Sequence, residues 1–370
     1  MNWNMKISGL QVFWIMMTFE IGNTLLLTMT ASAQEAKQDA WISMFIAGLG
    51  GILITFIATT LGLLYPNQTL IQFSKRIVGK WFGVLIIIPF FVQWYSEMAI
   101  VTREFSEFII ISLFRSTPLW VIIITISVLL VYIVYLGGIE SIGRCSEIIG
   151  PIVLVMIALI LVLDLGNCNW HRILPIYADS GWRPILQGAL FPMSFYSESV
   201  IMLMLIAFMD NSKRAQSRVM LAIGVSAFVV FVSTLFVLFT FGPALVSKMT
   251  YPFYDVARFI SILNFIQNID VVVVILWFTS VFIKLSVYLF VSCYGTAEWL
   301  GIRDWRKFLW ILAPMVVILA ICIPDVQVVS VEYYGKMYWV PYVFTINFLG
   351  IPIFLLVIGL FRKKLHVQNR

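Results

Sequence analysis

The chain has 370 residues and a net charge of +6, and 61% of its residues are hydrophobic while only 11% are charged. Its mean hydropathy of +0.99 lies far above the range of soluble proteins. This composition excludes an ordinary soluble domain and indicates an integral membrane protein. Because no stretch is long and polar enough to form a second domain, residues 1–370 are predicted to form a single transmembrane domain.

The chain contains about ten apolar segments, each long enough to cross the hydrocarbon layer as a helix of about 20 residues. The sequence therefore predicts an all-α membrane fold. The predicted spans lie near 8–31, 41–64, 82–108, 117–137, 146–163, 185–207, 219–242, 270–294, 308–323 and 338–361.

The basic residues predict the orientation of these spans. Fifteen Lys and Arg residues fall in the termini and loops on one side, seven fall on the other, and Arg103 and Lys284 lie inside spans. Since Lys and Arg are enriched on the cytoplasmic side, both termini are predicted to be cytoplasmic.

The first and sixth spans are interrupted by polar or helix-breaking residues. The first contains Glu20-Ile21-Gly22-Asn23, and the sixth reads "LFPMSFYSESV", in which Pro192 removes a backbone donor. A five-plus-five division, with repeats at about 8–163 and 185–361, pairs these two spans. Paired broken helices in inverted repeats are typical of a transporter site at the membrane midplane.

The longest outer connection, 243–269, has Val256, Phe259, Ile260, Leu263 and Ile266 at helical spacing. It predicts a short helix at the outer surface, which serves either as part of a gate or as a surface element without a gating role.

Several motifs occur in order along the chain. They are "ISGLQVFWIMMTFEIGNTLLL", "AKQDAWISMFIAGLGG", "TREFSEFI" with "TPLW", and "VFIKLSVYLFVSCYGTAEWLG". With them the chain resembles the B subunit of bacterial spore germinant receptors, the endospore germination permease family of the amino acid/polyamine/organocation transporter superfamily. The resemblance implies a ten-helix inverted repeat in the spore inner membrane, a small-molecule germinant such as an amino acid, and association with the lipid bilayer and the receptor A and C subunits.

The interruption in the first span supplies the first candidate ligand-binding residues. If Gly22 unwinds the helix, the freed backbone N–H groups can donate to an anionic group of a ligand. Asn23 would complete the polar lining. The alternative is that Gly22 merely permits close packing of two helices.

The buried charges supply further candidates, because an ionisable side chain is costly in a span. Glu20, Glu97 and Glu198 are the candidate partners of Lys284. Three roles are open for Glu20 and Glu198: each balances the ammonium group of a ligand, forms a structural ion pair with Lys284, or is protonated and hydrogen-bonded. We expect Lys284 to hold spans one and eight together. In sodium-coupled relatives of this architecture, hydroxyl residues of the eighth span help to hold the ion. Thr279 and Ser280 occupy a comparable place here. Because Lys284 lies nearby, its ammonium group is a candidate substitute for the sodium ion.

The remaining candidates are hydroxyl and aromatic residues near these charges. Ser194 and Ser197 cluster with Glu198, while Tyr95, Phe191 and Trp277, with Trp94 and Phe195, are candidate walls of a pocket. The alternative for each aromatic residue is core packing or lipid contact, which is the more frequent role of such residues in a span.

The sequence favours neither an enzyme nor a metal protein. The four cysteines lack C-x-x-C spacing, and the two histidines, His171 and His366, lie in a loop and the tail. No catalytic residue, metal site, cofactor or nucleic-acid partner is predicted. Three functions remain: a germinant-binding receptor subunit, a scaffold or ion or water conduit whose ligand binds another subunit, and an active amino-acid transporter.

Overall fold

The computed structural model describes residues 5–177, 181–261, 269–324 and 328–368. Within them lie ten helical segments that are long and apolar enough to cross a membrane, which confirms the predicted number. The described residues form helices and connections, with an isolated bridge between Ile7 and Met209 and no strand. The protein is therefore a multi-pass membrane protein.

The helices of the ten spans, in chain order, are α1 (Gly9–Leu27); α2 (Met29–Ala36) and α3 (Ala40–Leu64); α5 (Lys80–Leu85) and α6 (Ile88–Ser112); α7 (Leu119–Gly137); α8 (Ile139–Asp164); α9 (Trp182–Tyr196), η4 (Ser197–Ile201), α10 (Met202–Leu205) and η5 (Ile206–Phe208); η6 (Ser212–Arg214) and α11 (Ala215–Phe241); α14 (Asp270–Leu300); η7 (Trp305–Phe308) and α15 (Leu309–Cys322); and η8 (Val328–Gly350) with α16 (Ile351–Gln368). The connections contain η1 (Lys37–Asp39), α4 (Leu70–Val78), η2 (Leu165–Asn167), η3 (Trp170–Ile173), α12 (Pro243–Val246) and α13 (Pro252–Phe259).

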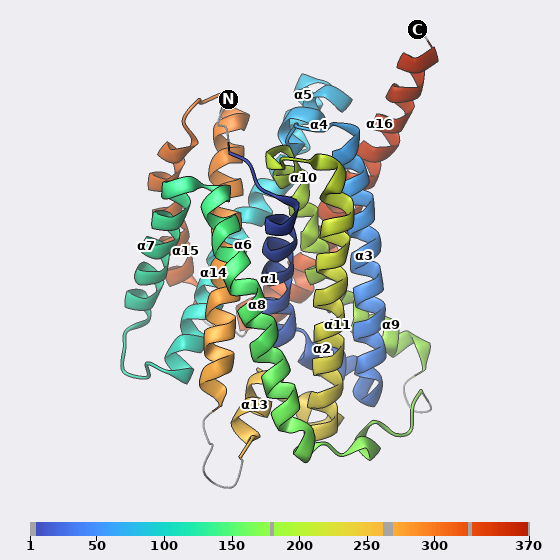
Figure 1. Ribbon diagram of the computed structural model, residues 1–370, viewed down its shortest axis with the longest axis vertical. Coiled ribbons are helices and arrows are strands. Elements are labelled where there is room, and N and C mark those ends of the chain that lie inside the picture. The colour runs from blue at the N-terminus through green and yellow to red at the C-terminus, as the bar shows by residue number, and fades with distance from the viewer. Residues whose placement is uncertain (1–4, 178–180, 262–268, 325–327, 369–370) are drawn as a thin grey trace.

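The spans form one bundle in which α1 begins and α16 ends at the same end (Figure 1). Three spans make up its interior. In the 18-residue apolar stretch of each span, 78% of the residues are buried in α1, 83% in α9–η5 and 67% in α14. The corresponding share is 28% for α7 and for α8, which form the periphery. Exposed Leu, Ile and Val on the outer helices are expected in any membrane protein, because lipid is equally apolar. The polar residues of the interior therefore say more about function.

The first span is not interrupted where the sequence predicts. Helix α1 is continuous through Glu20, Gly22 and Asn23, and it ends at Leu27, where Thr28 separates it from α2. The prediction of a break at Glu20–Asn23 is therefore wrong. A glycine costs an isolated helix about 1 kcal/mol, an amount that tertiary packing readily overrides.

The sixth span is interrupted where the sequence predicts. Helix α9 contains Pro192 and ends at Tyr196, after which the chain tightens into the 3₁₀ turn η4 that carries Glu198. The hydroxyl of Ser197 donates to the carbonyl of Met193 at 2.7 Å. This change of winding turns Glu198 into the bundle, where it is 1% exposed.

The short helix predicted within the connection 243–269 is present as α13. Its Val256 is fully buried, whereas Phe259 is 56% exposed. Leu263 and Ile266, also expected in this helix, lie outside the described residues. Tyr254 of α13 donates its hydroxyl to Asp270, the first residue of α14, at 3.0 Å, so α13 is fixed to the N-terminal end of that span.

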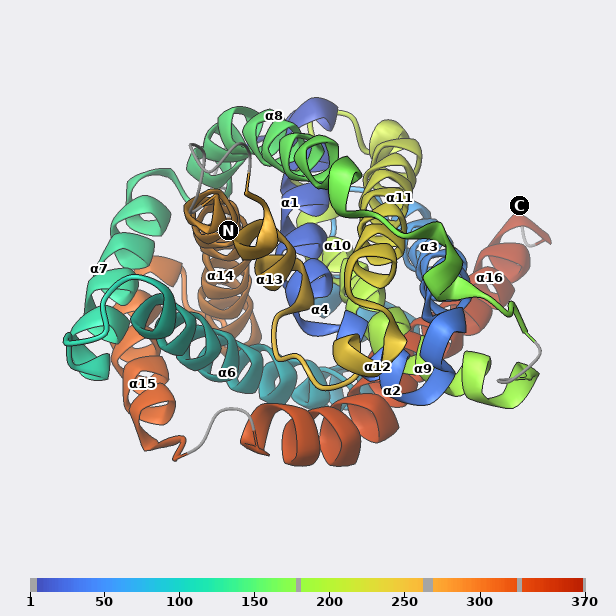
Figure 2. The same ribbon diagram turned by 90° about the horizontal axis from the view of Figure 1, so that it is seen from below.

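The last span begins earlier than the predicted residue 338. Its first part, η8, is wound as a π-helix and contacts both α6 and α9. Seen along the bundle, η8 passes across these two helices before α16 continues to the far end (Figure 2). The start of η8 thereby becomes a wall of the interior.

Candidate ligand-binding site

The centre of the bundle holds one lysine and two carboxylates from three different spans. Lys284 of α14, which is 1% exposed, places its Nζ 2.8 Å from both carboxylate oxygens of Glu198. The same Nζ lies 3.6 Å from Oε1 of Glu97 on α6. A charge this deep in an apolar bundle is tolerated because it is paired.

Two tyrosines supply further hydrogen bonds to these carboxylates. Tyr288, one turn after Lys284 on α14, donates to Oε2 of Glu198 at 2.6 Å. Tyr334 of η8 donates to Oε2 of Glu97 at 3.1 Å and lies 3.0 Å from the hydroxyl of Ser96. Each of the two carboxylates therefore has an ammonium and a phenol as partners, and these partners favour the ionised form against the effect of burial.

Aromatic rings surround the ammonium group on its remaining sides. Nζ of Lys284 lies 5.2 Å from the ring centroid of Phe19 on α1 and 5.6 Å from that of Phe195 on α9. Both distances fall within the range of cation–π attraction. The rings replace water around the ammonium and keep the ion pairs dry.

The ion pairs of Lys284 differ from those expected. They connect α14 with α6 and with η4, rather than with a carboxylate of α1, and the contact with α1 is made through Phe19. The expectation that Lys284 ties spans one and eight through an acidic partner is corrected accordingly. Glu20 of α1 is 2% exposed, and its Oε1 has no hydrogen-bond partner in the part of the chain that the structure describes.

A cavity of about 20 Å³ adjoins this cluster. Its lining comes from α1, α6, α9 and η8 and comprises Asn23, Glu97, Ile100, Glu104, Phe191, Phe195, Tyr334, Gly335 and Trp339. Oδ1 of Asn23 accepts a hydrogen bond from Nε1 of Trp277 at 3.4 Å. The amide nitrogen Nδ2 of Asn23 is buried and has no partner among the described residues, so a donor is available beside the cavity.

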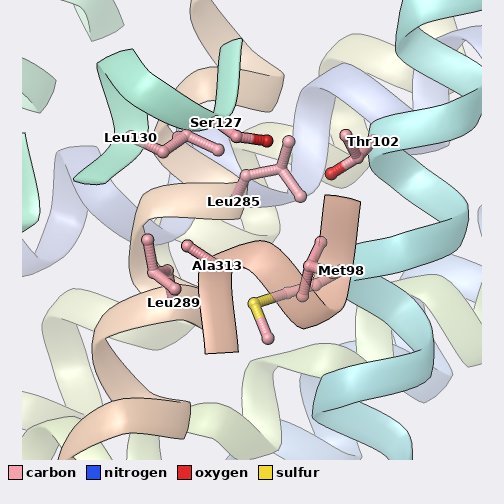
Figure 3. Close-up of a pocket in the computed structure, with 8 residues that line it drawn as sticks. Met98, Thr102, Ser127, Leu130, Leu285, Leu289 and Ala313 are labelled. Atoms are coloured by element: carbon pink, nitrogen blue, oxygen red, sulfur yellow. The ribbon is translucent and has the colours of Figure 1, made fainter. Parts of the chain in front are cut away.

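A second cavity, of about 10 Å³, lies between α6, α7, α14 and α15. Figure 3 shows Met98 and Thr102 of α6, Ser127 and Leu130 of α7, Leu285 and Leu289 of α14, and Ala313 of α15 around it. The hydroxyl of Ser127 donates to the carbonyl of Ile123 in its own helix. This apolar cavity shares no lining residue with the charged cluster and offers a ligand no charge, so the first cavity is the better candidate site.

Four hydroxyl residues proposed for the site are engaged in other bonds. Ser194 donates to Phe191, Ser197 to Met193, and the half-buried Thr279 to Ile275, each to a backbone carbonyl of its own span. The hydroxyl of Tyr95 pairs with that of Thr296 at 2.5 Å, in the last turns of α14. The structure brings Asn23, Glu97, Phe191, Glu198 and Lys284 together, whereas these four hydroxyl groups lie apart from the cavity.

Gly22 occupies a close contact between α1 and α14. A Cβ atom at this position would lie 2.7 Å from Cβ of Ser280 and 3.6 Å from the ring of Trp277. Since α1 is helical here, the backbone N–H groups keep their helical partners. The geometry favours the packing interpretation of Gly22 and removes the argument from an unwound backbone.

Sequence reasoning did not include Tyr288, Tyr334 and Trp339 among the candidate residues. The i, i+4 spacing of Lys284 and Tyr288 was a usable signal, because it places both on one helix face. Tyr334 lies in "VEYYGKMYW", whose polar residues resemble a loop, so its position inside the bundle had no comparable signal.

A bundle of ten spans around a buried charged cluster and cavity defines a membrane protein of the transporter type. Solved structures of this fold include MhsT in complex with L-phenylalanine, with a TM-score of 0.68 and 13% identity over 96% of this chain and 88% of that one. A second is Mhp1, a nucleobase-cation-symport-1 family transporter, with a TM-score of 0.59 and 11% identity over 85% of this chain and 72% of that one. Both establish similarity of fold alone.

The family model described as "Spore germination protein" matches residues 6–328, and the chain belongs to this family. Among its relatives in Bacillus subtilis (strain 168), spore germination protein YndE is 27% identical over 97% of this chain and 98% of its own length. Spore germination protein KB is 23% identical over 99% of this chain and 97% of its own length. Spore germination protein B2 is 21% identical over 97% of this chain and 97% of its own length. These relatives confirm the resemblance to the B subunits of germinant receptors.

Proposed function

We propose that this protein is the B subunit of a spore germinant receptor, that it binds an amino acid in the cavity beside Lys284, and that this binding triggers germination. The proposal places it in the spore inner membrane with both termini cytoplasmic, associated with the A and C subunits. The observation that carries it is the buried Lys284–Glu198–Glu97 cluster next to a cavity with an unpartnered amide donor.

An amino acid has an ammonium group, a carboxylate and a side chain, and the site offers chemistry for each. Glu97 lines the cavity as an acceptor for the ammonium group, and Nδ2 of Asn23 is a donor for the carboxylate. Glu20, one helical turn before Asn23 on α1, has a second acceptor without a partner among the described residues. Phe191 and Phe195 line the cavity with apolar surface for a small side chain. A scaffold subunit has no use for such a set of buried groups, whose desolvation is costly.

The cavity has the volume of about one water molecule, which is much smaller than an amino acid. Binding therefore requires the helices around it to separate. Because η8 supplies Tyr334, Gly335 and Trp339, a displacement of η8 opens one wall. Such a movement would convert ligand binding into a change of surface that neighbouring subunits can detect.

Direct binding tests the proposal. The purified protein in lipid nanodiscs would be titrated with each of the twenty L-amino acids by calorimetry. At least one should bind, and Asn23→Leu and Glu97→Gln should weaken that binding at least tenfold. Glu35→Gln is the matched control, because Glu35 is exposed on α2 and should bind as the wild type does. If no amino acid binds, the ligand site lies on another subunit.

A second candidate function is active amino-acid transport, which is favoured by the fold shared with MhsT, solved in complex with L-phenylalanine. Proteoliposomes separate the two functions, since a receptor binds its ligand without accumulating it. Uptake of the bound radiolabelled amino acid above that of protein-free vesicles would identify a transporter.

A further inference from the structure

The charged cluster contains more carboxyl groups than one ammonium can balance. Glu97, Glu198 and Glu20 are all at most 3% exposed, and Lys284 is the cation that pairs with two of them. If all three were ionised, the cluster would carry two uncompensated negative charges. Isolated buried carboxylates are so unfavourable that such a group takes up a proton instead.

The hydrogen bonds rank the three carboxyl groups by how much each gains from ionisation, and so identify the first group to take up a proton. Glu198 accepts from Lys284 and Tyr288, and Glu97 accepts from Tyr334 while facing the same ammonium at 3.6 Å. Glu20 has a buried oxygen without a partner among the described residues. The carboxyl group with the fewest donors gains least from ionisation, and that group is Glu20.

Among the described residues, no cation forms an ion pair with Glu20. It lies within electrostatic range of Glu198 and Lys284, and Tyr196 of α9 interacts with it. The hydroxyl of Tyr196 is itself buried without a partner in the described part of the chain. The other elements that pack on α1 place Glu147 of α8 at Gln11, near the start of the helix, and Ser226 of α11 at Met17. The remaining titratable groups of the cluster and cavity are Glu97, Glu104, Tyr288 and Tyr334.

Glu20 and Asn23 are three residues apart on α1 and therefore lie on the same face. Each has one buried polar atom without a partner among the described residues, an acceptor on Glu20 and a donor on Asn23. Asn23 lines the cavity, so a ligand there can reach the face that Glu20 shares. Together they match the ammonium and carboxylate groups of one amino acid.

We propose that Glu20 is the proton-exchanging group of the ligand site: it is protonated when no ligand is bound and releases its proton when the ammonium group of an amino acid takes the proton's place. In this exchange the O–H bond of Glu20 breaks, the proton leaves to solvent, and the carboxylate pairs with the incoming ammonium group. No covalent bond to the ligand forms. This inference rests on the proposed function and adds that the ligand carries a primary ammonium group and that acid opposes binding.

The protonation state of Glu20 can be measured without a ligand. Infrared spectra of the protein in nanodiscs at neutral pH should show the carbonyl band of a protonated, buried carboxylic acid. Glu20→Gln should remove the part of that band that Glu20 contributes, while Glu35→Gln should leave the band unchanged. An identical band in Glu20→Gln and the wild type, or its absence from the wild type, overturns the proposal.

Glu20→Gln also serves as a test of the fold, because its amide resembles a neutral carboxyl group. The variant should unfold within a few degrees of the wild type, whereas Glu198→Gln, which loses an ion pair, should unfold at a clearly lower temperature. A strongly destabilised Glu20→Gln protein contradicts the inference.

Proton release gives the third readout. Each L-amino acid that binds would be titrated in phosphate and in Tris buffer, which differ in ionisation enthalpy. The comparison should show release of about one proton, and the affinity should fall about tenfold per pH unit under acid conditions. Glu20→Gln should abolish both effects. Binding without proton release overturns this inference but leaves the proposed function intact. Absence of binding contradicts the proposed function. In that case the infrared band still decides whether Glu20 is protonated.

Discussion

Nζ of Lys284 lies 2.8 Å from both carboxylate oxygens of Glu198, and both side chains are buried. Removing one partner of a buried pair leaves the other charge uncompensated. Lys284→Met should therefore lower the free energy of unfolding by about 3–5 kcal/mol. Lys284→Met combined with Glu198→Gln should be more stable than Lys284→Met alone, since the second change removes the orphaned charge. Thermal unfolding of the purified proteins measures this, and a Lys284→Met single variant as stable as the wild type would contradict the account of the cluster.

Gly22 of α1 packs closely against Ser280 of α14, and substitutions can test this contact. In Gly22→Ala the new methyl group would meet Cβ of Ser280 at 2.7 Å, and the overpacking should cost about 1–3 kcal/mol of stability. Adding Ser280→Gly removes the obstructing atom and should restore part of the loss. Gly224→Ala on α11 is the control, because no atom of the described residues outside its own helix turn would lie closer than 4.0 Å to the added methyl group. Failure of Ser280→Gly to rescue Gly22→Ala would show that the contact is not limiting.

Tyr334 and Tyr333 offer a matched pair on η8. Tyr334→Phe removes the hydroxyl that donates to Glu97 and should lower the free energy of unfolding by about 1–2 kcal/mol. Tyr333 is 57% exposed, so Tyr333→Phe should have no measurable effect. Equal unfolding temperatures for the two variants would show that η8 does not support Glu97.

The outer helix α13 should lose its anchor at alkaline pH. Burial and the hydrogen bond to Asp270 raise the pKa of Tyr254 from 10.0 to about 12. A group with a raised folded-state pKa contributes its full stabilisation below the unfolded value and loses it as the pH rises through the folded value. The difference in unfolding temperature between the wild type and Tyr254→Phe should therefore be constant up to about pH 10 and shrink between about pH 10 and about pH 12. A difference independent of pH would exclude this bond as the anchor.

Cysteine labelling tests the proposed orientation. In a background without the four native cysteines, Lys363→Cys on α16 should react with an impermeant maleimide only from the cytoplasmic side. Lys336→Cys, near the start of the last span, should react only from the outside. The expectation follows from the excess of basic residues on the side of the termini. Reaction of both positions from one side would refute the arrangement.

The number and order of the spans were predictable from the sequence. Each span is a run of apolar residues about as long as the membrane is thick, and this requirement leaves a strong local signal. The same holds for the interruption beside Glu198, because Pro192 and the following serines weaken helical winding in any context. Lys284 was recognisable as a central residue because charge is rare in such runs.

The continuity of the first span at Gly22 was not predictable in this way. Gly22 is compatible both with an unwound helix and with a close helix contact, and the choice depends on Ser280, which is distant in sequence. The sequence offered three candidate partners for Lys284, and the choice among them likewise depends on packing between segments that are distant in sequence. Tyr334 and Trp339 follow a polar stretch, and only the packing of η8 on α6 and α9 brings them inside.

The ion-paired cluster also has a consequence for how the protein is made. Glu97 lies in the third span and Glu198 in the sixth, so both are synthesised before Lys284 in the eighth. A lysine at the centre of a helix opposes transfer from the translocon into lipid by about 2.5–3.5 kcal/mol. Both counter-charges are already in the membrane when α14 emerges, and they offset this cost only if α6 and η4 are in place. Insertion of α14 is thereby made conditional on correct placement of the spans before it, which gives the biogenesis machinery a means of rejecting misassembled chains.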